Sequence, residues 1–222
     1  MQLSALKHVV AGIALCGGVV ACSDSGPTMA PSETRLSIAD AVQARATAAG
    51  WFADVAGTAA AIAPDTVASL VVTITGVAYL PADATDETVE SAWQSLTLET
   101  PATLDLMALP TESSGSIAIA SGLVPAGAYR KVRLLTTGGE IVFKGPISLG
   151  GAITFDGGTP YTVTIPSGAQ TGLKTDITFE VTANQDGTTN AAYLVFDPGT
   201  TFLNVTTTGA GAVVLNPVLR AR

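Results

Sequence analysis

Histidine and cysteine are almost absent from this chain, and the few that occur lie near its N-terminus. The 222 residues include one histidine, His8, and two cysteines, Cys16 and Cys22. Everything after residue 22 therefore lacks both imidazole and thiol groups. This excludes Ser-His-Asp and Cys-His catalysis, His-ligated zinc, Cys-ligated clusters and internal disulfides from the rest of the chain. We accordingly expect no cofactor and no metal centre of these types.

Positive charge is also scarce. Ten lysines and arginines stand against 18 acidic residues, which gives a net charge of −8 at pH 7. Nucleic-acid binding needs a basic surface, so we expect no nucleic-acid partner. Thr and Val are frequent and favour strands, while 23 glycines and 12 prolines interrupt the chain at short intervals. This composition is typical of an all-β domain outside the cytoplasm.

The N-terminus contains a short apolar run that ends at a cysteine. Lys7 gives it a basic start, and residues 9–20 are apolar but too few for a stable transmembrane helix. Val19-Val20-Ala21-Cys22 then resembles a bacterial lipobox. The resemblance implies that residues 1–21 are a signal peptide and that Cys22 is acylated. The alternatives are a plain secretory signal, which would want small residues before its cut, and a membrane anchor, which would need a longer run.

Cleavage at Cys22 would leave a mature protein held to a membrane by its N-terminal lipid. Loss of Lys7 leaves nine basic and 18 acidic residues, a net charge of −9. Several acyl chains on one residue make such attachment close to permanent. Ser23 rather than Asp follows Cys22, and in Gram-negative lipoproteins this pattern implies sorting to the outer membrane. We expect an outer membrane lipoprotein of the cell envelope, facing the periplasm or the surface.

The remaining chain divides into a tether and one domain. Residues 22–33 comprise the lipidated cysteine and a polar segment with two prolines, which predicts a flexible tether. Residues 34–220 predict a single β-sandwich domain. Residues 41–63 are rich in alanine but contain two glycines, which predicts a small helical insertion near the N-terminus.

Short apolar or alternating segments, separated by turn residues, predict the strands of this sandwich. In residues 129–136 the alternation puts Val132 and Leu134 on one face and Tyr129, Lys131 and Arg133 on the other. Asp186-Gly187 is a strong hairpin signal between two strands. The predicted strands are residues 34–40, 68–79, 93–98, 102–107, 129–136, 140–143, 153–155, 161–165, 175–181, 191–196 and 212–215.

Several motifs resemble a bacterial lipoprotein family catalogued as domain of unknown function 4382. Its signature is similar to residues 165–174, Ile-Pro-Ser-Gly-Ala-Gln-Thr-Gly-Leu-Lys, which we call the decapeptide. Other segments with family-like motifs follow in the family's order: residues 36–41 (LSIADA), 72–77 (VTITGV), 104–109 (LDLMAL), 123–134 (LVPAGAYRKVRL), 196–197 (FD) and 215–218 (LNPV). The resemblance implies a prealbumin-like or Ig-like sandwich in the envelope, and it implies no activity.

The decapeptide allows two interpretations. Pro166, Gly168 and Gly172 restrict or free the backbone, which favours a shaped loop between strands. Binding groups also tend to sit on loops of a rigid scaffold. A possible ligand loop would present Ser167, Gln170, Thr171 and Lys174 outward.

Other candidate chemistry is weaker. The acidic run at residues 83–90 predicts a solvated loop, with calcium binding as the alternative. Paired carboxylates could also catalyse glycoside hydrolysis, which is the basis of the hydrolase alternative, but the sequence picks out no pair. An internal isopeptide bond would join Lys131, Lys144 or Lys174 to Asn204 or Asn216. Aromatic platforms for a glycan are limited to Trp51, Phe52, Tyr79 and Trp93.

These patterns favour a non-catalytic, lipid-anchored envelope protein that binds or scaffolds another envelope component. The first alternative is a glycan-binding module on the envelope, and the second is a carboxylate-based hydrolase. An envelope protein or a glycan is thus the expected partner, besides the membrane itself.

Overall fold

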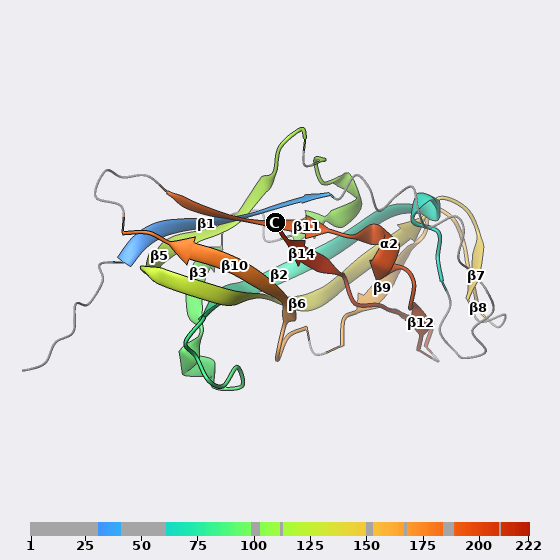
Figure 1. Cartoon of the computed structure of the whole chain (residues 1–222). Coiled ribbons are helices and arrows are strands. Elements are labelled where there is room, and N and C mark those ends of the chain that lie inside the picture. Colours follow the sequence, from blue (N-terminus) through green and yellow to red (C-terminus); the bar gives the residue numbers. More distant parts are fainter. Residues whose placement is uncertain are drawn as a thin grey trace, which may run out of the picture.

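The computed structural model describes residues 31–40, 61–98, 103–111, 113–149, 153–166, 168–183, 189–208 and 210–222. Cys22, Ser167, Trp51, Phe52 and most of the predicted helical insertion lie outside these ranges. Strands dominate the described chain, and the predicted all-β class is confirmed. Figure 1 shows an elongated molecule with β1 entering at one end and α2, β7 and β8 at the other.

Twelve strands form one continuous sheet, in the order β12-β13-β9-β6-β2-β3-β5-β1-β11-β14, with β10 also pairing with β6 and β4 with β2. Strands β7 and β8 form a separate pair. The bounds are β1 (Pro31–Asp40), β2 (Val67–Pro81), β3 (Gln94–Leu98), β4 (Thr103–Asp105), β5 (Ile117–Pro125), β6 (Gly127–Phe143), β7 (Ile147–Leu149), β8 (Ile153–Phe155), β9 (Pro160–Thr164), β10 (Leu173–Val181), β11 (Asn190–Phe196), β12 (Thr206–Thr207), β13 (Val213–Val214) and β14 (Leu219–Ala221). Short helical turns complete the described elements: η2 (Pro64–Thr66), η3 (Glu90–Ala92), η4 (Leu106–Ala108) and α2 (Pro198–Thr201).

Strand β6 is the longest, with 17 residues, and it unites two predicted strands. The predicted strands were residues 129–136 and 140–143, with Gly138 and Gly139 between them. Instead the strand continues through Gly138, whose φ is +100°, and Gly139, where a Cβ would overlap the Val71 carbonyl of β2. One edge of β6 pairs with β2, and the other is shared end to end by β9 and β10.

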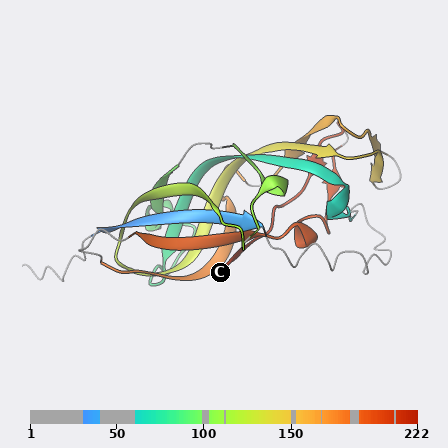
Figure 2. The ribbon, with the colours of Figure 1, turned by 90° about the horizontal axis from the view of Figure 1, so that it is seen from above.

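Strand β1 begins at Pro31, three residues before the predicted start of the domain. It pairs antiparallel with β5 and parallel with β11, so it lies inside the sheet rather than at an edge. Figure 2 shows β1 and β11 side by side. Leu36 and Ile38 are fully buried, as the alternation of this strand predicts. Residues 31–33 therefore belong to the sheet and not to the tether.

One hydrophobic core unites both halves of the sheet, with Leu36 and Leu194 on one side and Leu70, Tyr79 and Ile141 on the other. The fully buried rings of Phe143, Phe155 and Phe196 belong to the same core. The two parts of the sheet therefore enclose one hydrophobic core. Strand β3, which pairs with both β2 and β5, joins them.

The predicted face of Tyr129 is wrong. Leu80 pairs with Lys131 and Pro81 with Tyr129, so Arg130 is an extra residue on β6 at this point. Such a bulge shifts the alternation by one residue. Tyr129 is therefore turned inward, 4% exposed, and its ring centre lies 5.7 Å from that of Tyr79. Val132 and Leu134 face the core, as predicted.

The predicted hairpin turn at Asp186-Gly187 lies outside the described residues, and the described strands on either side of it pair with other strands. Strand β10 pairs with β6, whereas β11 pairs with β1 and β14. The Asn190 side chain links the two strands instead. Its oxygen accepts from the Thr182 N–H at 3.1 Å, and its amide donates to the carbonyls of Thr182 and Glu33.

Candidate functional site

A row of charged side chains lies on the outer face of β6 and β10. In β6, Val132 and Leu134 fill the core, so Lys131 and Arg133 point to the opposite face. In β10 the predicted alternation is confirmed, and Asp176 pairs with Lys131 while Lys174 pairs with Arg133. Three cations and one carboxylate thus meet on neighbouring strands.

The acidic run covers this row. Glu87 accepts hydrogen bonds from Lys174 at 3.2 Å and lies 3.4 Å from the Lys131 ammonium. Glu90 forms a bidentate pair with Arg133, whose Nη1 donates to Oε2 at 2.9 Å. Asp176 completes the set at 2.7 Å from Lys131. The run, predicted as a solvated loop, is thus a loop that folds back and neutralises three cations; we call residues 82–92 the acidic loop.

Trp93 fixes the end of the acidic loop. Its side chain is 6% exposed and packs against Ala78 and Leu80 on the outer face of β2. The indole N–H donates to the Glu87 carbonyl at 3.0 Å. The Arg133 guanidinium carbon lies 4.4 Å from the ring centre, a cation–π distance. Trp93 is thus a structural anchor.

The charges of the acidic loop argue against its use in acid catalysis. Hydrogen bonds from Lys174 lower the pKa of Glu87, those from Arg133 lower the pKa of Glu90, and those from Lys131 lower the pKa of Asp176. All three carboxylates are ionised at neutral pH, whereas a general acid must carry a proton there. Among the described residues, no three His, Cys, Asp or Glu side chains are grouped as for a metal ion.

The decapeptide connects β9 to β10 along the shared edge of β6. The Thr136 N–H donates to the Gly168 carbonyl at 2.9 Å, and the Gly168 N–H donates to Ile165 at 3.1 Å. A Cβ on Gly168 would lie 2.5 Å from the Thr136 hydroxyl. Gly172 has a φ of +72°, which favours glycine, and a Cβ there would lie 2.8 Å from the Leu134 carbonyl. The geometry is that of a shaped connection pressed against β6.

The side chains of the predicted ligand loop do not all converge. Gln170 and Thr171 are exposed on the surface. Lys174 belongs to β10, and its ammonium turns toward Glu87 and the Trp93 ring, 5.7 Å from the ring centre. Ser167 lies beyond the described ranges. The decapeptide therefore contributes Lys174 to the charged row, and presents Gln170 and Thr171 to solvent.

The other sequence candidates are placed as follows. Lys144, Asn204 and Asn216 are exposed, and Lys131 and Lys174 are ion-paired on the outer face, so these residues do not form the buried triad that an isopeptide bond needs. Tyr79 is fully buried. With Trp93 also buried, neither of these two rings offers an exposed platform for a glycan.

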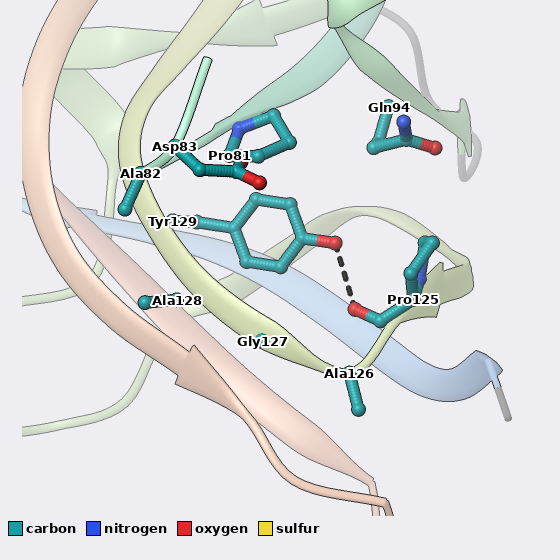
Figure 3. Close-up of a pocket in the computed structure, with 9 residues that line it drawn as sticks. All are labelled: Pro81, Ala82, Asp83, Gln94, Pro125, Ala126, Gly127, Ala128 and Tyr129. Atoms are coloured by element: carbon teal, nitrogen blue, oxygen red, sulfur yellow. Dashed lines mark hydrogen bonds between the residues drawn. The ribbon is translucent and has the colours of Figure 1, made fainter. Parts of the chain in front are cut away.

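A cavity of about 450 Å³ opens where β5 turns into β6. Figure 3 shows the Tyr129 ring among the lining residues, with Pro81 and Asp83 to one side of it and Gln94 to another. The Tyr129 hydroxyl donates to the Pro125 carbonyl at 2.7 Å and closes the turn. The turn itself needs Gly127, whose φ is +146°.

The polar groups of the cavity come from different parts of the chain. Asp83 belongs to the acidic loop and Gln94 starts β3 just after it, while Tyr129 lies in β6 next to the β5–β6 turn. Burial raises the pKa of Tyr129, and the nearby Asp83 carboxylate raises it further, so the phenol stays protonated. A carboxylate, an amide and a phenol oxygen therefore border one hollow. Sequence reasoning missed Asp83 and Gln94 as a pair, because only the folded loop brings them to the turn.

The family comparison covers most of the domain. The family described as "Domain of unknown function (DUF4382)" matches residues 54–217. The chain belongs to this family. The match starts after β1, so residues 36–41, which we compared with the family's opening strand, lie outside it. No curated protein and no solved structure shows a significant match to the chain.

Several DUF4382-like motifs hold the fold together. The Asp105 carboxylate accepts from the N–H groups of Leu70 and Met107, both at 3.0 Å, and so joins η4 to β2. Asp197 caps α2 by accepting from the Thr200 N–H at 3.0 Å. Tyr129 closes the turn that borders the cavity. In the part of the chain that the structure describes, no helix has the length and apolar character needed to span a membrane.

Proposed function

We propose that this DUF4382 protein is a non-catalytic, lipid-anchored protein of the outer membrane that binds or scaffolds another envelope component. The cavity at the β5–β6 turn supports the binding role. Concave sites with a few convergent polar groups are where small ligands and partner side chains bind. Asp83, Gln94 and Tyr129 provide such groups at this cavity.

The lipobox-like Val19-Val20-Ala21-Cys22 supports the anchor. Mass spectrometry of the protein purified from membranes tests this part of the proposal. The expected species starts at Cys22 and carries acyl chains, and Cys22→Ser is expected to leave the chain uncleaved. An unmodified Cys22, or a chain that retains residues 1–21, would contradict the anchor.

A glycan is the second candidate ligand, and the cavity favours it over the aromatic platforms. An amide and a carboxylate are suitable partners for sugar hydroxyls, and Gln94 and Asp83 line the same cavity as Pro81 and Tyr129. The ligand would have to be small, because Tyr129 is almost buried. Carbohydrate binding that disappears in Gln94→Ala would promote this candidate over a protein partner.

Photo-crosslinking in intact cells tests the binding role directly. A photoreactive residue replaces Ala82, which is exposed at the cavity, and in the control it replaces Thr154, which is exposed on β8. We expect a discrete adduct from position 82 and a weaker or different pattern from position 154. Identical patterns from the two positions would show that the cavity is not the binding site.

A further inference from the structure

We propose that the end of the domain with the β5–β6 turn faces the membrane, and that the tip of this turn rests on the lipid surface. This inference builds on the proposed lipid anchor at Cys22. It adds an orientation, a contact surface and a partner, namely the headgroup boundary of the bilayer to which the chain is attached.

The length of chain before β1 sets the orientation. Eight residues, 23–30, separate Cys22 from Pro31. The nine Cα–Cα steps from Cys22 to Pro31 reach about 32 Å even when fully extended. Strand β1 alone runs about 30 Å from this end toward the other, and α2, β7 and β8 lie beyond it at the far end (Figure 1). The end at Pro31 is therefore the near end, because the far end could approach the membrane only with the tether fully extended and the domain inverted.

The β5–β6 turn lies at this near end. Pro31 pairs directly with Pro125, the last residue of β5. The ends of β2 and β10 are there too, because Pro81 pairs with Tyr129 and Val181 with Gly127. In contrast, the Ile62 N–H ahead of β2 donates to the Phe202 carbonyl, which places Leu203 at the far end.

The tip of the turn has the surface chemistry of a lipid contact. Residues 113–129 contain no charged side chain. Leu123 is 67% exposed, more than the other exposed large hydrophobic side chains of the described chain, and Pro125 beside it is exposed as well. An exposed leucine alone is ordinary. Its place within reach of the anchor, on an uncharged turn, is what points to the bilayer.

Charge decides which lipid surface fits. Glu33 is exposed and pairs with Leu123 across β1 and β5, and Asp83 is exposed at the cavity. These carboxylates would be repelled by anionic headgroups. The contact is therefore apolar, with a zwitterionic surface, and the side chains of the tip would enter only the outer 5–10 Å or so, as in other interfacial contacts.

Fluorescence quenching by labelled lipids tests the orientation. The full-length lipoprotein is purified and reconstituted into vesicles of phosphatidylethanolamine and phosphatidylcholine that contain spin-labelled lipid. A single introduced cysteine carries an environment-sensitive dye, in A126C at the tip or in T154C at the far end. The unsubstituted protein should take up no dye, because acylation consumes Cys22 and cleavage removes Cys16.

We expect strong quenching at position 126 and almost none at position 154. In the A126C protein, Leu123→Asp should reduce the membrane-contacting population about tenfold, because it replaces the exposed apolar side chain of Leu123 with a charged one. The matched change Leu203→Asp at the far end should leave the quenching at position 126 unchanged.

Two kinds of failure are distinguishable. Vesicles that carry the protein while position 126 stays unquenched, or while both positions are quenched equally, would overturn the orientation and leave the anchor intact. Protein that does not float with vesicles, or an unsubstituted chain that takes up dye at Cys22, would overturn the anchor and the orientation with it.

Discussion

The guanidinium carbon of Arg133 lies 4.4 Å from the centre of the Trp93 ring. This contact joins the middle of the longest strand to the end of the acidic loop, 40 residues earlier in the chain. Arg133 is 4% exposed, and its charge is balanced by Glu90. A nearly buried cation needs such a partner, so the acidic loop is part of the folded domain rather than an appendage to it.

Trp93→Ala should destabilise the domain. The side chain is buried, packs on Ala78 and Leu80, and donates to the Glu87 carbonyl. Losing a buried tryptophan costs about 3 kcal/mol or more in the free energy of unfolding. Urea denaturation followed by circular dichroism measures the change. A loss below about 0.5 kcal/mol, the range of ordinary surface substitutions, would mean that the acidic loop is not packed as described.

Acid should weaken the domain through the acidic loop. Hydrogen bonds from Lys174 and Arg133 hold the pKa values of Glu87 and Glu90 below their ordinary value of 4.5. Their stabilising contribution is therefore complete above pH 4.5 and is lost as the pH falls through the lower, folded-state values. The melting temperature should fall less between pH 7 and pH 3 in the double variant Glu87→Gln, Glu90→Gln.

The control for this pH dependence is Glu140→Gln, which changes an exposed carboxylate on the same strand as Arg133. Its melting temperature should follow the wild-type curve. If the double variant also follows that curve, the two ion pairs do not contribute to stability in solution.

Tyr129→Phe should lower the free energy of unfolding by about 1 kcal/mol. The substitution keeps the ring but removes the hydroxyl that donates to the Pro125 carbonyl at 2.7 Å. Chemical denaturation measures the loss, with Tyr193→Phe as the control because Tyr193 is 46% exposed. If the two substitutions lower the free energy of unfolding equally, the hydrogen bond from Tyr129 to Pro125 does not stabilise the domain.

Substituting a glycine of the decapeptide should destabilise the domain more than substituting its lysine, because the glycines set the backbone conformation. Gly172→Val places a β-branched side chain at a φ of +72° and against the Leu134 carbonyl, so it should lower the melting temperature clearly. Lys174→Ala removes a solvent-accessible ion pair with Glu87, and such surface pairs contribute little to stability. If Lys174→Ala unfolds the domain instead, the lysine is an essential structural partner.

The alternation of apolar and polar residues predicted the two faces of a strand well where the strand contains no bulge. In β10 the alternation of Ile177 and Phe179 with Thr178 and Glu180 is enough to assign the two faces. The same rule fails for Tyr129, because the bulge at Arg130 arises from pairing with β2, almost 50 residues earlier in the chain. Sequence alone carries no local sign of that extra residue.

The charged row and the cavity could not be predicted from the sequence for a related reason. Lys131 and Arg133 alternate with core residues, which marks them as outward-facing but does not name their partners. Those partners, Glu87 and Glu90, come from a run whose local composition is that of a solvated loop. The opposite charges meet only because the acidic loop folds back over β2 and β6. The same folding of the loop places Gln94 beside the β5–β6 turn.

The family match and the folded sheet begin at different residues, because β1 lies inside the sheet but before the matched region. The family match starts at residue 54, yet β1 fills the gap between β5 and β11 and contributes the fully buried Leu36 and Ile38. A recombinant fragment cut at residue 54 would leave two long, unpaired strand edges facing an empty slot. Such edges recruit strands from other molecules, so that fragment should aggregate, whereas expression from Pro31 onward keeps the sheet whole.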